Sequence, residues 1–148
     1  MIVADTSAMV AIAFAEPERD AFIAVMQRAD RVLISTVSVV EARMAVHGRR
    51  GQCAVVLVDD LIRLPMFAIV PPGPAEMDAA SAAFIAFGKG NGHPAGLNFG
   101  DVFNYALAKV RGLPLLFKGA DFSETDVADA LKASASNASA SNAHASKP

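Results

Sequence analysis

The sequence is poor in several residue types, and each shortage excludes something. Its 148 residues include one cysteine and no tryptophan, so no internal disulfide can form and nothing ties the chain to an oxidising compartment. Charged residues make up only 19% of the chain and the formal net charge is −2, so no global basic field attracts nucleic acid. No apolar run approaches the ~18 residues that a membrane-spanning helix needs, and the N-terminus lacks the positive region of a signal peptide. We therefore expect a cytoplasmic protein.

Apolar content, in contrast, is ample, because 53% of the residues are hydrophobic. This is enough to bury the core of one ordinary domain. After Leu131 the composition changes to KASASNASASNAHASKP, where Ala, Ser and Asn dominate and large apolar side chains are missing. Such a segment cannot offset its own ordering entropy. We predict one domain over residues 1–131 and a disordered tail over residues 132–148.

Short apolar runs alternate with helical patterns along the domain. The runs are typical of strands buried on both faces, and the segments between them repeat their apolar residues at helical spacing. Strands are predicted at residues 1–4, 31–35, 67–70 and 115–117, and helices at 6–15, from 17 onward, from 39 to about 48, and at 53–63, 76–87 and 101–111. The Gly-rich segment 89–100 is predicted to be an exposed loop. Strands alternating with helices predict an α/β fold with a mostly parallel sheet flanked by helices.

Four acidic residues hold special places in this scheme. Asp5 ends the first predicted strand and Asp121 follows the last, while Glu41 and Asp101 lie on helices. Ligand sites in open parallel sheets form beyond the carboxyl ends of the strands, so we expect the acids to meet at that rim. Carboxylates this close repel one another, and a divalent cation relieves the repulsion. Hard oxygen ligands without His or Cys favour Mg²⁺, with Mn²⁺ possible, and such an ion supports attack of water on a phosphodiester.

Each acid taken alone has a simpler interpretation. Asp5 could cap the following helix, a role that Thr6 or Ser7 could also fill. Glu41 could be a solvated helix residue, Asp101 could complement a helix dipole, and Asp121 could lie in a turn. The joint placement favours a shared site, because four independent caps need not follow this order along the chain.

Four segments of the sequence carry a resemblance to a known family. They are IVADTSAMVAI, ISTVSVVEARMAV, GHPAGLNFGDVFNYALAKVRGLPLLFKGADF and SETDV, and together they span about Met1 to Val127. The combination of LNFGD-x-F-x-YALA with LLFKG-x-DF is the specific part. In these segments the chain resembles the PIN-domain ribonucleases, and among them the VapC-type toxins of type II toxin–antitoxin systems.

The resemblance implies a PIN fold, with a central mostly parallel sheet between layers of helices, and Mg²⁺-dependent cleavage of RNA. It implies a cognate antitoxin as partner, within a homodimer or a toxin–antitoxin hetero-oligomer. It implies that the catalytic and metal-binding acids are Asp5, Glu41, Asp101 and Asp121, with Asp5 and Asp101 as the primary ligands. The hydroxyl that orients the first Asp then falls at Thr6 and Ser7.

Three further positions bear on this resemblance. Ala120 stands where many relatives have an acid, so one carboxylate is missing beside Asp121. Asp126 could contribute by analogy, although a turn or helix cap is the simpler role. Asn104, one helical turn beyond Asp101, could hydrogen-bond a water on the metal or could face solvent.

RNA binding requires positive charge near the acidic rim, because phosphate contacts supply affinity and register. Arg43, two residues after Glu41, and Lys118, three before Asp121, are the candidates, although either could be an ordinary surface charge. Accessible single-stranded loops are the expected targets. An apolar face formed by Val10, Phe14, Phe22 and Met26 could belong to the core or could contact a partner. We hypothesise that an antitoxin covers this face and inserts a cation among the acids.

Two other functions stay open at this point. One is a phosphatase-like Mg²⁺ hydrolase with Asp5 as nucleophile. That chemistry usually pairs the nucleophile with a second Asp two residues later, where this chain has Ser7. The other is a non-catalytic α/β interaction module with a vestigial acid cluster. The presence of all four acids argues against it.

Overall fold

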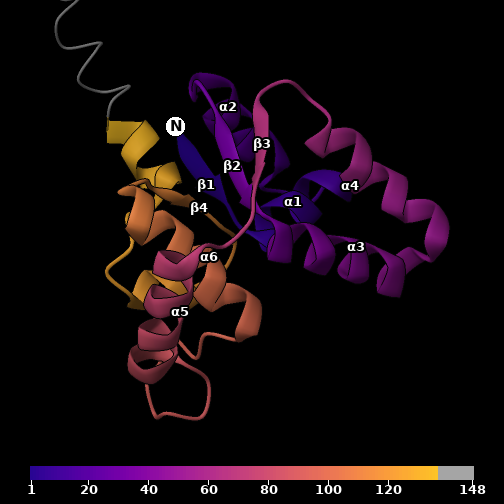
Figure 1. Cartoon of the computed structure of the whole chain (residues 1–148). Coiled ribbons are helices and arrows are strands. Elements are labelled where there is room, and N and C mark those ends of the chain that lie inside the picture. The colour runs from indigo at the N-terminus through magenta and orange to yellow at the C-terminus, as the bar shows by residue number, and fades with distance from the viewer. Residues whose placement is uncertain (137–148) are drawn as a thin grey trace, which may run out of the picture.

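The centre of the protein is a parallel sheet of four strands in the order β3-β2-β1-β4 (Figure 1). The structure is a computed structural model, and it describes residues 1–136. The strands are β1 (Ile2–Ala4), β2 (Val32–Ser35), β3 (Phe67–Val70) and β4 (Leu115–Leu116). Val3 is in register with Leu33 of β2 on one side and with Leu115 of β4 on the other. The predicted α/β class and parallel sheet are confirmed.

Six α-helices correspond to the predicted ones, and a further helical stretch covers residues 130–136. The six are α1 (Thr6–Ala13), α2 (Arg19–Arg28), α3 (Thr36–Arg50), α4 (Val55–Ile62), α5 (Pro74–Phe87) and α6 (Phe99–Arg111), with short 3₁₀ helices η1 (Gln52–Ala54) and η2 (Asp121–Glu124). Helix α3 begins three residues before the predicted start, because the Ser35 hydroxyl accepts from the Val37 amide and caps it at the end of β2. Apolar periodicity alone does not show a cap of this kind.

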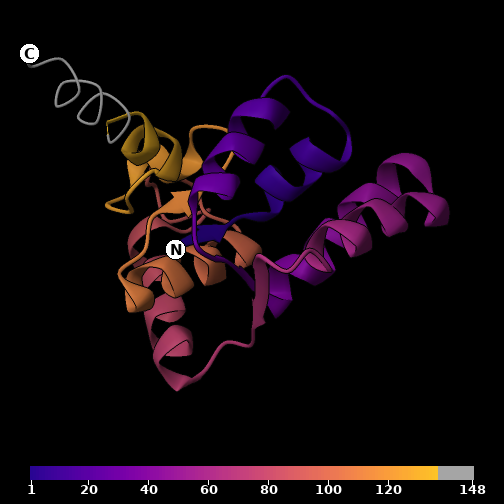
Figure 2. The same cartoon turned by 90° about the horizontal axis from the view of Figure 1, so that it is seen from above.

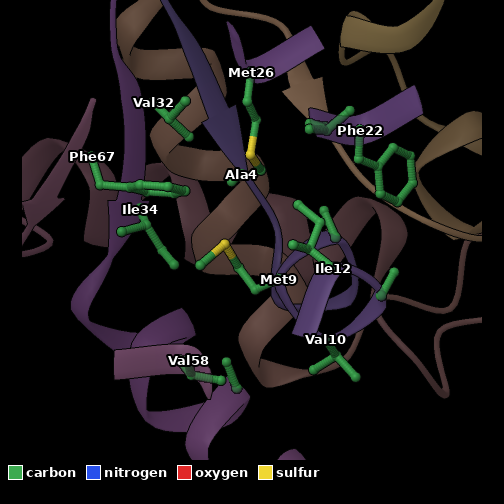
Figure 3. Packing of buried hydrophobic residues seen from close by; sticks show 14 of the residues in the cluster. Ala4, Met9, Val10, Ile12, Phe22, Met26, Val32, Ile34, Val58 and Phe67 are labelled. Carbon is green, nitrogen blue, oxygen red and sulfur yellow. The ribbon is translucent and has the colours of Figure 1, made fainter. Parts of the chain in front are cut away.

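Two separate hydrophobic clusters lie on the two faces of the sheet. Side chains alternate along the strands: Val32 and Ile34 enter the cluster shared with α1 to α4, whereas Leu33 between them enters the cluster shared with α5 and α6. Figure 3 shows part of the first cluster, in which Met9 and Ile12 of α1 lie against the strands. Figure 2 shows α3 and α4 extending to one side of the sheet, away from α5 and α6. The result is the predicted three-layer arrangement.

The chain order places a topological switch between β1 and β4. From β1 the chain builds outward through β2 to β3, and it then crosses to the opposite edge to form β4 beside β1. The Asp5 amide donates to the Leu116 carbonyl over 2.9 Å, so the ends of the two central strands are fastened together. In open parallel sheets a crevice forms at such a point.

Two predictions about less regular segments need correction. The Gly-rich loop is not exposed throughout, because Ala95 and Leu97 are buried against α5 and α6 and Leu97 forms an isolated bridge with Gly88. Residues 132–136, expected in the disordered tail, are helical and follow a cap in which the Asp129 carboxylate accepts from the Leu131 amide over 2.8 Å. The rest of the predicted tail lies outside the described residues. Within residues 1–136, no helix has the length and apolar character to cross a membrane.

The apolar face suggested for an antitoxin is mostly internal. Val10, Phe22 and Met26 are each at most 5% exposed and belong to the cluster around α1 and α2. Phe14 is half-buried, with the guanidinium groups of Arg49 and Arg50 over its ring at 5.6 and 5.0 Å from the centroid. These residues therefore belong to the core, which was the alternative to a partner surface.

Candidate active site

All four predicted acids line one pocket at the carboxyl ends of the central strands. The pocket has a volume of about 530 Å³. Its lining comes from the end of β1, from α1, from α3, from the start of α6 and from the segment after β4. The acids in the lining are Asp5, Glu16, Glu41, Asp101 and Asp121. Residues far apart in sequence thus meet at the switch point between β1 and β4.

Asp5 is the most enclosed of these acids, with 3% of its surface exposed. One carboxylate oxygen accepts from the Ser7 amide over 2.8 Å and also from the Ser7 hydroxyl, and the other accepts from the Asn104 amide group over 2.6 Å. Burial raises the pKa of Asp5, although these hydrogen bonds oppose the rise. Asp5 therefore caps α1 and also lines the pocket, and its role as a metal ligand stays a prediction.

Asn104 of α6 is fully buried and links Ser38 of α3 to Asp5. Besides donating to Asp5, it accepts a hydrogen bond from the hydroxyl of Ser38 on α3. The alternative that Asn104 faces solvent is wrong, because α6 packs against β1 and α3 on this side. Asn104 does not line the pocket, so its contact is with the carboxylate itself.

Glu41 lies on α3, and its side chain reaches the pocket beside Gly100 of α6. Its carboxylate accepts from the Thr6 hydroxyl over 3.0 Å, and its pKa is raised by burial and by the charge of Asp5. A Cβ added at Gly100 of α6 would overlap this carboxylate. Glycine at that position therefore allows the glutamate to lie against the α6 backbone.

Asp101 enters the pocket from the first turn of α6. Its carboxylate accepts from the Asn98 amide over 2.8 Å, and the Asn98 side chain accepts from the Gly100 and Asp101 amides, which forms a capping box. Burial raises the pKa of Asp101 to about 6, and the charges of Asp5, Glu41 and Asp121 add to the rise. Asp101 therefore belongs to the capping box of α6 and also lines the pocket, and its role as a metal ligand stays a prediction.

Asp121 is the first residue of η2 and is exposed to solvent at the rim of the pocket. Its charge is felt by Asp101, as the raised pKa of that group shows. Asp121 thus lies in a short 3₁₀ turn and lines the same pocket as the other three acids, and its part in a metal site stays a prediction.

The donor set of the pocket is suited to a hard divalent cation. It consists of carboxylate, hydroxyl and amide oxygens, which Mg²⁺ and Mn²⁺ prefer. The acids are not already closed into a cage: within residues 1–136, no three acidic, histidine or cysteine side chains stand close enough to hold one ion. The carboxylates of Asp5, Glu41 and Asp101 each accept a hydrogen bond from a neighbouring residue instead. Binding an ion in the pocket would require these carboxylates to move closer together.

The two predicted RNA-binding cations differ in position. Lys118 lines the pocket, and its ammonium lies 2.9 Å from Glu16 and 2.8 Å from Glu18. Arg43 does not line it: the guanidinium pairs with Asp59 over 2.8 Å and lies in a separate shallow groove. Two residues along a helix correspond to about 200° of rotation, so a residue two after Glu41 points away from the site.

Asp126 also lies away from the pocket lining. It accepts from the Tyr105 hydroxyl over 2.6 Å and pairs with Lys109 over 2.8 Å, which lowers the pKa of its carboxyl. These contacts tie the segment after η2 to α6. The suggestion that it contributes to the site by analogy is not supported by this position.

Several residues that support the acids were not among the predicted site residues. Asn98 and Ser38 position Asp101 and Asn104, and Gly100 makes room for Glu41. The pattern Asn-x-x-Asp before an apolar helical run could have identified the capping box at Asn98. No sequence pattern indicates the contact between Gly100 and Glu41, because it joins two helices.

A family model described as the PIN domain matches residues 2–128. The chain belongs to the PIN-domain family. It is 41% identical over 127 residues to Ribonuclease VapC30 of Mycobacterium tuberculosis, covering 86% of this chain and 96% of that protein. The chain is also similar to the crystal structure of VapC20, a Sarcin-Ricin loop cleaving toxin of the same organism. The two align with a TM-score of 0.71 at 16% identity, over 87% of this chain and 98% of that one.

A toxin–antitoxin complex from Klebsiella pneumoniae also shares the fold. It aligns with a TM-score of 0.57 at 17% identity, covering 82% of this chain and 90% of that one. At these identities the two solved structures support the fold alone. The family itself, and the chain's place among the VapC-type members, follow from the family model and from VapC30.

Proposed function

We propose that this chain is a metal-dependent endoribonuclease that hydrolyses RNA phosphodiester bonds and acts as the toxin of a toxin–antitoxin pair. The observation that carries the proposal is the meeting of Asp5, Glu41, Asp101 and Asp121 around one pocket. Relatives named as ribonucleases make RNA the substrate class to test first. The cytoplasm, where RNA is accessible, is the proposed compartment.

Asp5 and Asp101 are the proposed primary ligands of Mg²⁺, for which Mn²⁺ could substitute, with Glu41 and Asp121 completing the acidic surround. When bound, the ion would lower the pKa of a water molecule and offset negative charge on the phosphodiester. The remaining tasks belong to the chain itself and concern how the ligands are held and how the RNA is bound.

Neighbouring side chains hold the ligands in place. Ser7 and Asn104 fix both oxygens of Asp5, and Thr6 fixes Glu41. Asn98 holds Asp101 at the first turn of α6. These contacts keep the carboxylates beside the pocket, and binding of the ion would then draw them closer together.

A cognate antitoxin is the proposed partner, and its inhibitory group would be a cation placed among the acids. We also propose that the chain forms a homodimer or a hetero-oligomer with the antitoxin. Large apolar side chains exposed on the single chain support a further interface; among them are Met44 at 67%, Phe99 at 73% and Ile85 at 76% exposed. Light scattering of the chain alone and with the product of an adjacent short reading frame would test both assemblies.

The test of the enzymatic proposal is cleavage of a structured RNA by the wild-type chain and by Asp101→Asn, with and without Mg²⁺. The variant removes the charge but keeps an oxygen that can accept from the Asn98 amide. We expect Mg²⁺-dependent cleavage by the wild type and a loss of at least about 100-fold in the variant. Equal cleavage by both proteins would refute the assignment. Hydrolysis of small phosphate esters without RNA cleavage would favour the phosphatase alternative, and inactivity on both substrates would favour an interaction module.

A further inference from the structure

Besides the four acids, the lining of the pocket carries two cations joined by one carboxylate. Arg49 at the end of α3 and Lys118 after β4 both line the pocket, as does Glu16 between them. One Glu16 oxygen lies 2.9 Å from the Arg49 guanidinium, and the other lies 2.9 Å from the Lys118 ammonium. We call the four acids the acidic part of the pocket, and Arg49 and Lys118 its cationic part.

Glu16 occupies this place because the turn after α1 aims it there. The Ala15 amide donates to the Ile12 carbonyl and the Glu16 amide donates to the Ala11 carbonyl, which is the pair of hydrogen bonds of a Schellman motif. The motif requires a left-handed residue, and Ala15 adopts φ 52° although it has a side chain. Strained backbone held by its surroundings is found at functional positions more often than elsewhere.

The ion pairs themselves contribute little to the stability of the fold. The Arg49 side chain is 58% exposed and that of Lys118 is 35% exposed, and ion pairs in contact with water are weak. Another anion can therefore replace Glu16 without disturbing the core. A phosphodiester, like a carboxylate, presents two terminal oxygens that share one negative charge, and both bind Arg and Lys through charge-assisted hydrogen bonds.

We propose that Arg49 and Lys118 bind a backbone phosphate of the RNA next to the one that is cleaved, and that Glu16 occupies this phosphate site in the free protein. RNA binding then replaces the Glu16 carboxylate with the phosphate. The inference rests on the proposed function, because it assumes that the acidic part of the pocket receives RNA. It adds two residues, Arg49 and Glu16, to those expected to govern substrate binding.

The arrangement has a direct consequence for affinity. Glu16 competes with the RNA phosphate for two cations, so removing its charge should strengthen binding, whereas removing either cation should weaken it. Lys118 also pairs with Glu18 over 2.8 Å, so Glu16→Gln frees Arg49 fully and Lys118 only in part. The double variant Glu16→Gln/Glu18→Gln should therefore bind more tightly than the single one.

The experiment is fluorescence anisotropy with a labelled single-stranded RNA, in Mg²⁺, on the full chain carrying Asp101→Asn to suppress cleavage. We expect Glu16→Gln to lower Kd about threefold or more, and Arg49→Gln and Lys118→Gln to raise it by a similar factor. The slope of log K against log salt should become shallower by about 0.7 for each cation that no longer neutralises a phosphate. Circular dichroism verifies that each variant is folded.

Matched controls lie in the ion pair between Arg43 and Asp59, which is outside the pocket. Asp59→Asn makes the same change in net charge as Glu16→Gln and also frees an arginine, while Arg43→Gln matches Arg49→Gln. We expect both controls to leave Kd and the salt slope unchanged. If Glu16→Gln and Asp59→Asn strengthen binding equally, or if Arg49→Gln has no effect, the phosphate site is refuted.

The outcome separates this inference from the proposed function. Cleavage by otherwise wild-type protein tests the acids, whereas binding in the Asp101→Asn background tests the cations. Active protein whose Glu16 and Arg49 variants bind RNA like the controls would overturn the phosphate site and leave the nuclease intact. Inactive protein whose binding still shifts as expected would overturn the nuclease and leave the phosphate site intact.

Discussion

Replacing Asp101 by Asn should make the metal-free protein more stable at neutral pH, although it should abolish activity. The pKa of Asp101 is raised from its ordinary value of 3.8 to about 6, chiefly by burial and further by three neighbouring carboxylates. A raised carboxyl pKa means that the folded state holds the proton more tightly than the unfolded state does. The charged form is therefore destabilising above pH 6, and this penalty disappears as the pH falls toward 4.

The size of the effect follows from the shift. One pKa unit corresponds to 1.36 kcal/mol, so the full shift would amount to about 3 kcal/mol. Asp101 is only partly enclosed, and we halve the figure for solvent screening to about 1.5 kcal/mol. Asparagine should therefore raise the free energy of unfolding by about 1.5 kcal/mol at pH 7.5 and by almost nothing at pH 4. The cap on Asn98 is preserved in the variant, because the amide oxygen can still accept.

Urea denaturation followed by circular dichroism is the suitable assay, since the chain has no tryptophan. The control is Asp20→Asn, whose side chain is 92% exposed and which should change stability by less than about 0.5 kcal/mol. Saturating Mg²⁺ should stabilise the folded wild type, because the ion binds only the folded state. The gain should be smaller in Asp101→Asn, which lacks one of the proposed ligands. An Asp101→Asn protein no more stable than the wild type at pH 7.5 without metal would refute the electrostatic reasoning.

Three further changes test other parts of the site. Asn104→Ala removes a buried partner of Asp5 and should lower the free energy of unfolding by about 1–3 kcal/mol in a denaturant titration; an unchanged midpoint would contradict the contact. Gly100→Ala should displace Glu41 and lower RNA cleavage at least about tenfold, whereas Gly48→Ala, with open space around it, should keep full activity and gain about 0.5–1 kcal/mol of stability; equal activity in both would exclude the steric role. Ala15→Gly relieves a left-handed alanine and should raise the thermal midpoint slightly, and a lower midpoint would show that no strain is stored there.

The parts of the fold that follow from local pattern were predictable from the sequence. Apolar runs such as IVA at β1 and VLIS at β2 mark buried strands, and the order of strands and helices dictates a parallel sheet whose carboxyl ends meet. Asp5 and Asp121 could be brought together on that argument alone. Helix starts were less accurate, because they depend on caps such as Ser35 rather than on apolar spacing.

The parts of the site that depend on contacts between helices were not predictable. The angle at which Arg43 leaves α3 directs it to Asp59, and no spacing rule reveals that partner. No sequence pattern singles out Glu16, and its contacts with Arg49 and Lys118 exist only because α3 and the segment after β4 lie around it. A single sequence indicates which residues lie near a rim. The rotation of each helix decides which of them reach the pocket.

The central claim is that the four acids bind a divalent cation. The most direct measurement is an anomalous difference map from crystals of the protein grown with Mn²⁺, since manganese scatters anomalously and substitutes for Mg²⁺ at oxygen sites. We expect a peak in the pocket lined by Asp5, Glu41, Asp101 and Asp121, and no such peak in Asp101→Asn. A wild-type map with no peak in this pocket, from protein that cleaves RNA in the presence of Mn²⁺, would contradict the account.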